Sequence, residues 1–218
     1  MSDAATLRPP TPTPTPTPAS TSTPWTISTE PVDSPDARAL LREYYAEVAD
    51  RYFTLHEDRL STPQEIDEGV AEYPVADLAP PHGVLLVARR GGETAGCAGV
   101  RLLDACTAEL KQMFVRPAAR GLGGGGGLLM AAEAAAARLG ARRIRLDTRL
   151  DLTEAIALYR RHGFVEIAPY HDDIYAEIFF EKHLGSGDGS HSGHDGPSNG
   201  TSASSDSNGA PSGGRHSA

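Results

Sequence analysis

Residues 116–130 read RPAARGLGGGGGLLM, a run of glycines that follows two arginines and leads into an apolar helical stretch. Each glycine inside a helix costs about 1 kcal/mol relative to alanine, so glycines at this place need a physical reason. The first N–H groups of a helix have no partner within it, and the helix dipole favours a negative charge there. Glycines let an anion approach those N–H groups closely, and Arg120 can add charge-assisted hydrogen bonds. The stretch therefore predicts a phosphate-binding site.

Two common phosphate-binding motifs do not fit this stretch. Gly121, Gly123 and Gly126 match the spacing of the dinucleotide-binding fingerprint, but a run of glycines satisfies almost any such pattern. The fingerprint also needs its glycine turn directly after a parallel strand, with an acidic residue about 20 positions further on. Here RPAAR intervenes and Asp147 comes too late. A P-loop needs Gly-Lys-Ser/Thr, whereas the last glycine precedes a leucine. A flexible loop without a ligand is the alternative that stays open at this point.

A third interpretation accounts for the residues on both sides of the glycines. Val115, Pro117, Arg120 and the glycines after it follow the pattern V-x-P-x-x-R-G-x-G. This pattern resembles the acetyl-CoA signature of the GNAT N-acetyltransferase superfamily. Downstream, EAIALYRRHGFVEI at residues 154–167 is similar to the family's second landmark, A-x-x-L-Y-x-K-x-G-F. The resemblance implies the family's fold, acetyl-CoA as co-substrate, and direct transfer of an acetyl group to an amine.

The resemblance also implies which residues hold the cofactor. The strand that ends at Val115 is expected to pair with the pantetheine arm through its backbone, and the pyrophosphate is expected at the glycines. Arg161 stands where the landmark has lysine, and it either reaches the pyrophosphate or faces solvent. The predicted cofactor-binding residues are Met113, Phe114, Val115, Arg120, Gly121, Leu122, Gly123, Gly124, Gly125, Gly126 and Arg161.

The sequence departs from the family pattern at two places. Glycines continue to Gly127, where relatives more often carry side chains, so the first turn of this helix is expected to be soft without a ligand. Leu152 stands where relatives often have an asparagine that touches pantetheine. The hydrogen bond from this asparagine to pantetheine is therefore not expected in this chain.

Two residues are implied as catalytic. Tyr159 occupies the tyrosine position of the second landmark, where the family's phenol commonly donates a proton to the leaving thiolate. The alternative is a core tyrosine, because Tyr159 lies one turn from Ile156 on an amphipathic helix. Glu109 matches a strand position that serves as general base in some histone-type relatives. Its alternative is an ordinary exposed carboxylate, since many relatives use water chains instead of a fixed base.

Several polar residues are candidates for the acceptor side. The carboxylates of HDD at residues 171–173 are interpreted as attracting an ammonium group rather than a metal, with a solvated turn as the alternative. The H-x-x-H pair at residues 191–194 is interpreted as linker, so no metal site is predicted. The tyrosine candidates are Tyr45, Tyr52, Tyr170 and Tyr175, the first two with helix-face packing as the alternative.

Hydrophobic periodicity and turn signals predict the elements that must position these residues. Helices are expected at 34–53, 62–73, 127–140 and 152–163. Strands are expected at 25–29, 84–90, 94–103, 107–115, 142–148, 164–168 and 176–184. This order predicts an α+β fold of GNAT type, with a mixed, mostly antiparallel central sheet of six to seven strands flanked by about four helices.

Composition divides the chain into one domain and two tails. Residues 1–24 contain a Thr-Pro alternation, and residues 185–218 are rich in Gly and Ser, so both are expected to be disordered around an N-acetyltransferase domain at 25–184. The net charge of −9 argues against nucleic acid as a partner, and no apolar run predicts a signal peptide or a membrane partner. Cys97 and Cys106 are expected to be reduced and buried, which favours a cytoplasmic location.

The sequence thus predicts an acetyl-CoA-dependent N-acetyltransferase that acts on the primary amine of a small molecule, such as an amino acid, a polyamine or a drug-like amine. A peptide or protein N-acetyltransferase is the alternative enzyme. A non-catalytic module that senses acyl-CoA is the alternative from another class, because Leu152 replaces the usual asparagine. The oligomeric state, a homodimer included, is left open.

Overall fold

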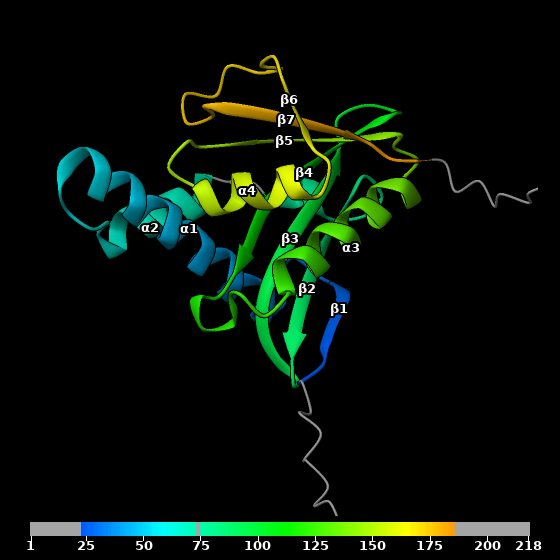
Figure 1. Cartoon of the computed structure of the whole chain (residues 1–218). Coiled ribbons are helices and arrows are strands. Elements are labelled where there is room, and N and C mark those ends of the chain that lie inside the picture. Colours follow the sequence, from blue (N-terminus) through cyan, green and yellow to red (C-terminus); the bar gives the residue numbers. More distant parts are fainter. Residues whose placement is uncertain (1–22, 73–74, 186–218) are drawn as a thin grey trace, which may run out of the picture. The chain divides into compact units, whose positions relative to one another are not determined.

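The computed structural model describes residues 23–72 and 75–185 (Figure 1). Seven strands form one sheet in the order β1-β2-β3-β4-β5-β7-β6, and four α-helices pack on it. This confirms the predicted α+β fold and the predicted order of elements. Apart from residues 23, 24 and 185, the predicted tails lie outside the described residues.

The elements occupy the following ranges. The strands are β1 (Trp25–Glu30), β2 (Gly83–Arg90), β3 (Glu93–Leu102), β4 (Thr107–Val115), β5 (Arg143–Thr148), β6 (Val165–Ile167) and β7 (Ile178–His183). The helices are α1 (Pro35–Glu57), α2 (Pro63–Glu72), α3 (Gly124–Arg138) and α4 (Thr153–Arg161). Short 3-10 turns lie at Ala76–Leu78 and Pro117–Ala119.

Side-chain caps set the starts of the first two helices. The Ser34 hydroxyl accepts a hydrogen bond from the N–H of Ala37 at the start of α1, and Pro35 follows it. At the start of α2, Thr62 and Glu65 cap each other: the Thr62 Oγ1 accepts from the Glu65 N–H at 3.2 Å, and the Glu65 carboxylate accepts from the Thr62 N–H at 2.7 Å. This reciprocal pair is a capping box.

All but one of the strand pairs in the sheet are antiparallel. The exception is β4 and β5, which run parallel and pair only from Thr107 opposite Arg143 to Glu109 opposite Arg145. Beyond Glu109, β4 continues to Val115, while β5 pairs with β7 on its other side. Residues 110–115 of β4 therefore have no strand partner on the β5 side within the described part of the chain.

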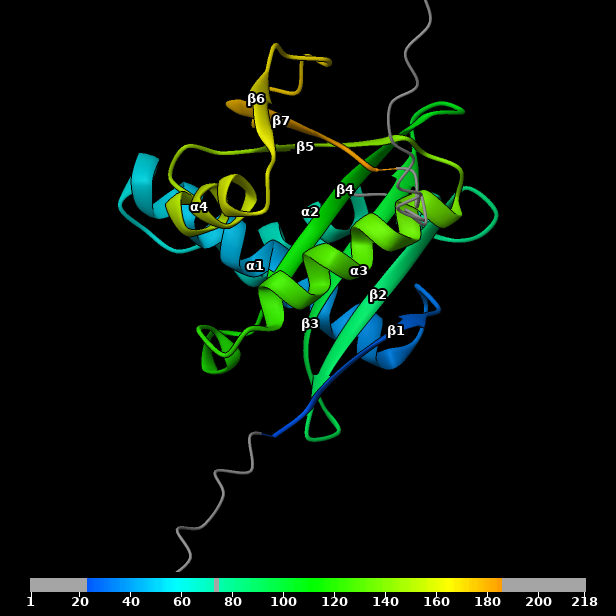
Figure 2. The same ribbon diagram turned by 45° about the vertical axis from the view of Figure 1, so that its right-hand side comes forward.

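Helices cover both faces of the sheet. Figures 1 and 2 show α3 in front of the strands and α1 behind them. Leu128 of α3 and Ile156 of α4 are buried in one cluster with Leu110 of β4. Leu40 of α1 is buried in a second cluster with Phe114 of β4. Leu110 and Phe114 are four residues apart and would share a face of a regular strand, so the opposite layers they contact show that the alternation of β4 shifts by one residue between them.

The two cysteines differ in burial, which corrects the expectation that both are buried. Both are free thiols, but only Cys97 is buried, whereas Cys106 is half-buried. Burial raises the pKa of the Cys97 thiol to about 12, so it stays protonated and unreactive near neutral pH. Separately, no helix in the described ranges is long and apolar enough to cross a membrane.

The close approach of β3 to the end of β4 depends on a glycine. A Cβ atom at Gly96 would lie 2.4 Å from the carbonyl oxygen of Phe114. We therefore expect Gly96→Ala to lower the free energy of unfolding by ~1–3 kcal/mol, the usual cost of overpacking. Urea denaturation measures this change. A variant as stable as the parent chain would show that the two strands can move apart without cost.

Candidate active site

A β-bulge shapes the strand that borders the site. Cys97 pairs with Phe114 and Gly99 pairs with Lys111, so β4 contains one residue more than β3 between these pairs. Gln112, inside this segment, has a φ of 51°, a left-handed conformation that non-glycine residues rarely adopt. A bulge bends its strand and increases the local twist. It lies where β4 has already lost its pairing with β5.

A cavity of about 450 Å³ opens at this divergence. It is lined by β4, β5, the segment before α3, the first turn of α3, the start and inner face of α4, and the middle of α1. Of the residues predicted to bind the cofactor, those that line it are Met113, Phe114, Val115, Arg120, Gly121, Gly123, Gly125, Gly126 and Arg161. The structure therefore brings most of the predicted set to one place. Leu152 lies there too and contributes an apolar wall.

Two predicted cofactor residues are held by Trp25 instead. The carbonyl oxygen of Leu122 accepts a hydrogen bond of 2.8 Å from the Trp25 indole. A Cβ at Gly124 would lie 2.4 Å from the Trp25 ring. Neither residue is among those that line the cavity. Packing against β1 therefore accounts for the glycine at position 124.

The start of α3 presents its N–H groups without a side-chain cap. Gly123 is the N-cap residue, with a φ of 89°, and it makes no side-chain cap hydrogen bond. Gly125 and Gly126, in the first turn, line the cavity. The N-terminal end of a helix with bare N–H groups attracts an anion. The end of the cavity at α3 therefore suits an anion.

Two arginines lie at the same end. Arg161 lines the cavity from α4. The Arg120 Nε donates to the carbonyl oxygen of Val115 at 2.8 Å, and its guanidinium pairs with Glu47 of α1. Glu47 also pairs with Arg51. In this structure the Arg120 guanidinium, which is predicted to bind a phosphate, is therefore paired with the carboxylate of Glu47.

Tyr159 packs in the core and also borders the cavity. Its ring packs between those of Phe164 and Phe180, with centroids 5.9 and 6.1 Å away, so it is a core residue. It also lines the cavity. Burial, and then the charge of Asp147, raise the pKa of the Tyr159 phenol well above its ordinary value of 10.0. The phenol therefore keeps its proton near neutral pH.

Glu109 lies deeper than an ordinary strand carboxylate. Its side chain is 1% exposed. One oxygen accepts from the Arg101 Nε at 2.7 Å, and the other accepts from the Tyr170 hydroxyl at 2.9 Å. Burial, and then the Glu109 charge, raise the pKa of the Tyr170 phenol far above its ordinary range. Glu109 is not among the residues that line the cavity, and its Oε1 holds the loop that carries Tyr170 while its Oε2 holds Arg101.

Asp147 and Lys111 form the charged pair that does line the cavity. Asp147 follows Arg145 by two residues on β5, and Lys111 follows Glu109 by two on β4, so they are the next residues on the same face beyond the last paired positions. Their Nζ and Oδ1 atoms are 3.1 Å apart. The sequence pattern did not single out either residue as part of a site. Only the register of the two distant strands places them together.

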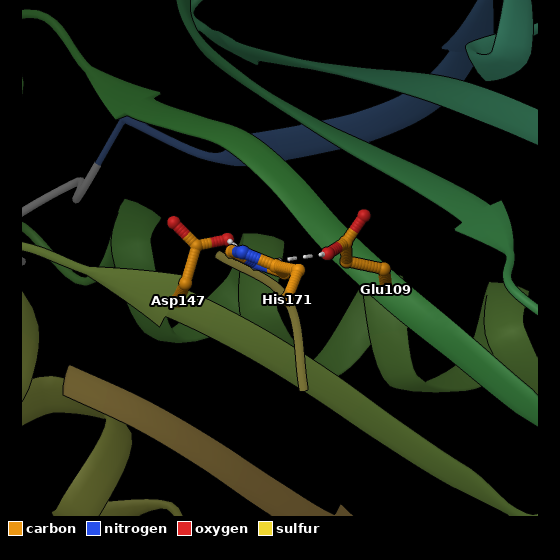
Figure 3. Close-up of side chains that lie close together, drawn as sticks. All are labelled: Glu109, Asp147 and His171. Atoms are coloured by element: carbon orange, nitrogen blue, oxygen red, sulfur yellow. Dashed lines mark ion pairs between the residues drawn. The ribbon is translucent and has the colours of Figure 1, made fainter. Parts of the chain in front are cut away.

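His171 completes a cluster with the two carboxylates (Figure 3). Its Nε2 lies 3.4 Å from the Asp147 Oδ1 and 4.0 Å from the Glu109 Oε1. One ligand atom from each of the three residues lies within 4.8 Å of the others, a spacing that could hold a metal ion. However, the His171 Nδ1 accepts from the N–H of Asp173 at 3.3 Å, which assigns the proton of the neutral ring to Nε2. An Nε2–H group facing carboxylates, which already pair with Arg101 and Lys111, does not suit a metal.

The acceptor-side tyrosines fall into two groups. Tyr52 and Tyr175 meet edge to face, with centroids 5.4 Å apart. Tyr45 packs against Gly69 of α2, where a Cβ would lie 1.7 Å from the Tyr45 hydroxyl oxygen. Burial, and then Tyr175, raise the pKa of Tyr45. Tyr170 belongs elsewhere, with the Glu109 carboxylate.

The chain resembles known proteins over most of its described length. The sequence profile of the Acetyltransferase (GNAT) family matches residues 38–164. An uncharacterized N-acetyltransferase of Schizosaccharomyces pombe is 34% identical over 154 residues, which span 69% of this chain and 87% of the relative. A protein of Azospirillum brasilense named IAA acetyltransferase is 38% identical over 113 residues, which span 49% of this chain and 72% of the relative. Among solved structures, a GNAT family acetyltransferase from Elizabethkingia anophelis with acetyl-CoA bound has a TM-score of 0.50 at 20% identity. That match covers 73% of this chain and 98% of the other.

The glycines of α3 lead to a stability prediction. A Cβ at Gly125 would make ordinary contacts, the nearest being 3.4 Å from a Leu158 methyl group. Gly125→Ala should therefore raise the free energy of unfolding of the protein by up to about 1 kcal/mol. Urea denaturation checks this, with Gly124→Ala as the control that clashes with Trp25 and loses stability. Equal losses in both variants would mean that packing, rather than access to the backbone, requires both glycines.

Proposed function

The chain belongs to the acetyltransferase (GNAT) family, and on that premise we propose that it transfers the acetyl group of acetyl-CoA to the primary amine of a small molecule. One observation carries the proposal. A single cavity joins an end suited to an anion, at Gly125 and Gly126, to a half-buried carboxylate, that of Asp147. The first end suits the pyrophosphate of the cofactor, and the second suits an ammonium group.

The residues of the cavity fit acetyl-CoA by their chemistry. The bare N–H groups of α3 and the guanidinium of Arg161 would hold the pyrophosphate, joined by Arg120 once it leaves Glu47. The unpaired edge of β4 at residues 110–115 offers backbone donors and acceptors to the amide groups of the pantetheine arm, as a neighbouring strand would. The cofactor supplies a thioester, whose acetyl group is activated toward an amine.

Tyr159 is proposed as the proton donor. Tyr159 lines the cavity, and its phenol stays protonated at neutral pH, since burial and Asp147 raise its pKa further above its ordinary value of 10.0. When a group donates a proton to the departing sulfur, CoA leaves as a thiol rather than as a less stable thiolate. The aromatic packing around the ring restricts its position.

Asp147 is proposed as the group that meets the acceptor. Its carboxylate lines the cavity, pairs with an ammonium group already, and lies on the same sheet face as the buried Glu109. An acceptor ammonium that replaces the Lys111 contact would be held there and could pass a proton to the carboxylate. Glu109, the general base predicted from the family's strand position, has both oxygens occupied by Arg101 and Tyr170. We therefore place the proton acceptor at Asp147 and keep Glu109 as the anchor of the Tyr170 loop.

The cofactor assignment predicts a specific stabilisation. A ligand present at a hundredfold excess over its dissociation constant adds about 2.7 kcal/mol to stability. Acetyl-CoA should therefore raise the melting temperature, whereas NAD and ATP at equal concentration should do much less. Gly125→Asp, which puts a negative charge beside the bound phosphates, should abolish the shift while Gly125→Ala keeps it. Aspartate in the first turn suits the helix itself, so the variant should stay folded. A full response of Gly125→Asp, or an equal one to NAD, would refute the assignment.

The proposed roles predict an order among three nearly isosteric variants. With the best amine from a panel, assayed by release of free CoA, Tyr159→Phe and Asp147→Asn should each lower kcat by ~10²–10⁴-fold, the usual contribution of general acid–base catalysis. Glu109→Gln should lower it less, because its role is to anchor a loop. The raised pKa of Tyr159 also predicts no loss of kcat from its ionisation below its ordinary value of 10.0. If Glu109→Gln proves the most damaging, the base belongs at Glu109.

A further inference from the structure

Lysine is rare in this chain, and its placement is informative. The chain has two lysines, Lys111 and Lys182. All its other lysine or arginine residues are arginines. One of these two primary amines lines the cavity that we assign to acetyl transfer. We propose that Lys111 is an internal acceptor, so that the protein acetylates its own side chain; this inference rests on the proposed function.

The alternation of β4 places Lys111 on the acceptor side. Leu110 and Met113 pack in the cluster under α3, on the face where the cofactor-binding glycines lie. Lys111 follows Leu110 and points to the opposite face, where its Nζ meets Asp147. Residues from both faces of β4 nevertheless line the cavity at this point, because β4 and β5 have separated. The Lys111 amine therefore lies where β4 and β5 separate, between the proposed cofactor side of the cavity and the acceptor side.

The groups needed for transfer to Lys111 line the same cavity. Its ammonium is 3.1 Å from the Asp147 Oδ1, and Tyr159 lines the same cavity. The ammonium first gives one proton to the Asp147 carboxylate, and the neutral Nζ forms a bond to the carbonyl carbon of the thioester. As the carbon–sulfur bond breaks, the sulfur takes a proton from Tyr159, and the nitrogen loses its second proton, which restores the phenol. Acetyl-CoA and a lysine ammonium thus give an acetyl-lysine, free CoA and one proton to solvent.

Acetylation of Lys111 would change the acceptor side. An acetylated lysine has no positive charge and cannot pair with Asp147, so the carboxylate becomes available to an incoming ammonium group. The modification would also place a small apolar cap in the cavity. Self-acetylation would therefore compete with an external amine at first and alter its binding afterwards.

Lys182 is a matched internal control. Its side chain is 25% exposed, as is that of Lys111, and it pairs with a single carboxylate, that of Glu133, at 2.7 Å. It lies on β7 and is not among the residues that line the cavity. Simple chemical acetylation by the thioester has no reason to distinguish the two lysines, whereas catalysis within the cavity does.

The test incubates the full chain with acetyl-CoA and no added amine, and maps acetylated lysines by mass spectrometry over time. We expect Lys111 to gain an acetyl group at least tenfold faster than Lys182, at a rate constant that does not depend on protein concentration. Tyr159→Phe should slow the reaction at Lys111 by ~10²-fold or more. Lys111→Arg keeps the positive charge and removes the acceptor, so its chain should stay unmodified at this position, while Lys182→Arg should behave as the parent chain.

A parallel assay of CoA release with the amine panel separates the inference from the proposed function. CoA release with amines while Lys111 stays unmodified would overturn self-acetylation and leave the proposed function intact. No release with any amine and no modification would overturn both. Equal rates at Lys111 and Lys182, or an unchanged rate at Lys111 in urea, would also overturn the inference, because the reaction would then be chemical acetylation of exposed amines.

Discussion

The parallel pairing of β4 with β5 stops after Glu109 and Arg145, and the rest of the site depends on this limit. Each further pair would close the gap with backbone hydrogen bonds and fill it with side chains. Instead the bulge at Gln112 bends β4, and the two strands separate. The free edge of β4, the cavity, and the meeting of residues from both faces of the sheet all follow from that separation.

The two ends of the cavity have opposite electrostatic character, and in this structure protein groups satisfy both. At the α3 end, Glu47 holds Arg120. At the other end, Lys111 holds Asp147. A pyrophosphate and an acceptor ammonium carry the same charges as the protein groups they would replace. Partly exposed ion pairs contribute little net stability, so such exchanges cost little. The proposed binding site thus has its charged groups in place without a ligand.

The glycine run illustrates how one sequence feature can have several physical causes. Gly121 and Gly123 have positive φ values of 73° and 89°, which a turn before the helix requires. Gly124 makes room for the ring of Trp25. Gly125 has neither requirement, since a side chain there would make only ordinary contacts, and it lines the cavity. Access to the helix backbone is therefore the reason for only part of the run.

Local signals in the sequence determined the order of strands and helices, the caps of α1 and α2, and the glycine-rich start of α3 without a side-chain cap. Such features depend on residues a few positions apart, so their spacing is legible in the chain itself. The identity of Tyr159 and Glu109 as candidates also came from sequence, through the resemblance of two motifs. What only the tertiary structure decided is how these candidates are partnered. Glu109 is occupied by Arg101 and Tyr170, whereas Asp147 and Lys111 face the cavity, because the register between two strands separated by helix α3 sets which side chains meet. That register arises from packing across the whole sheet, which no local pattern encodes.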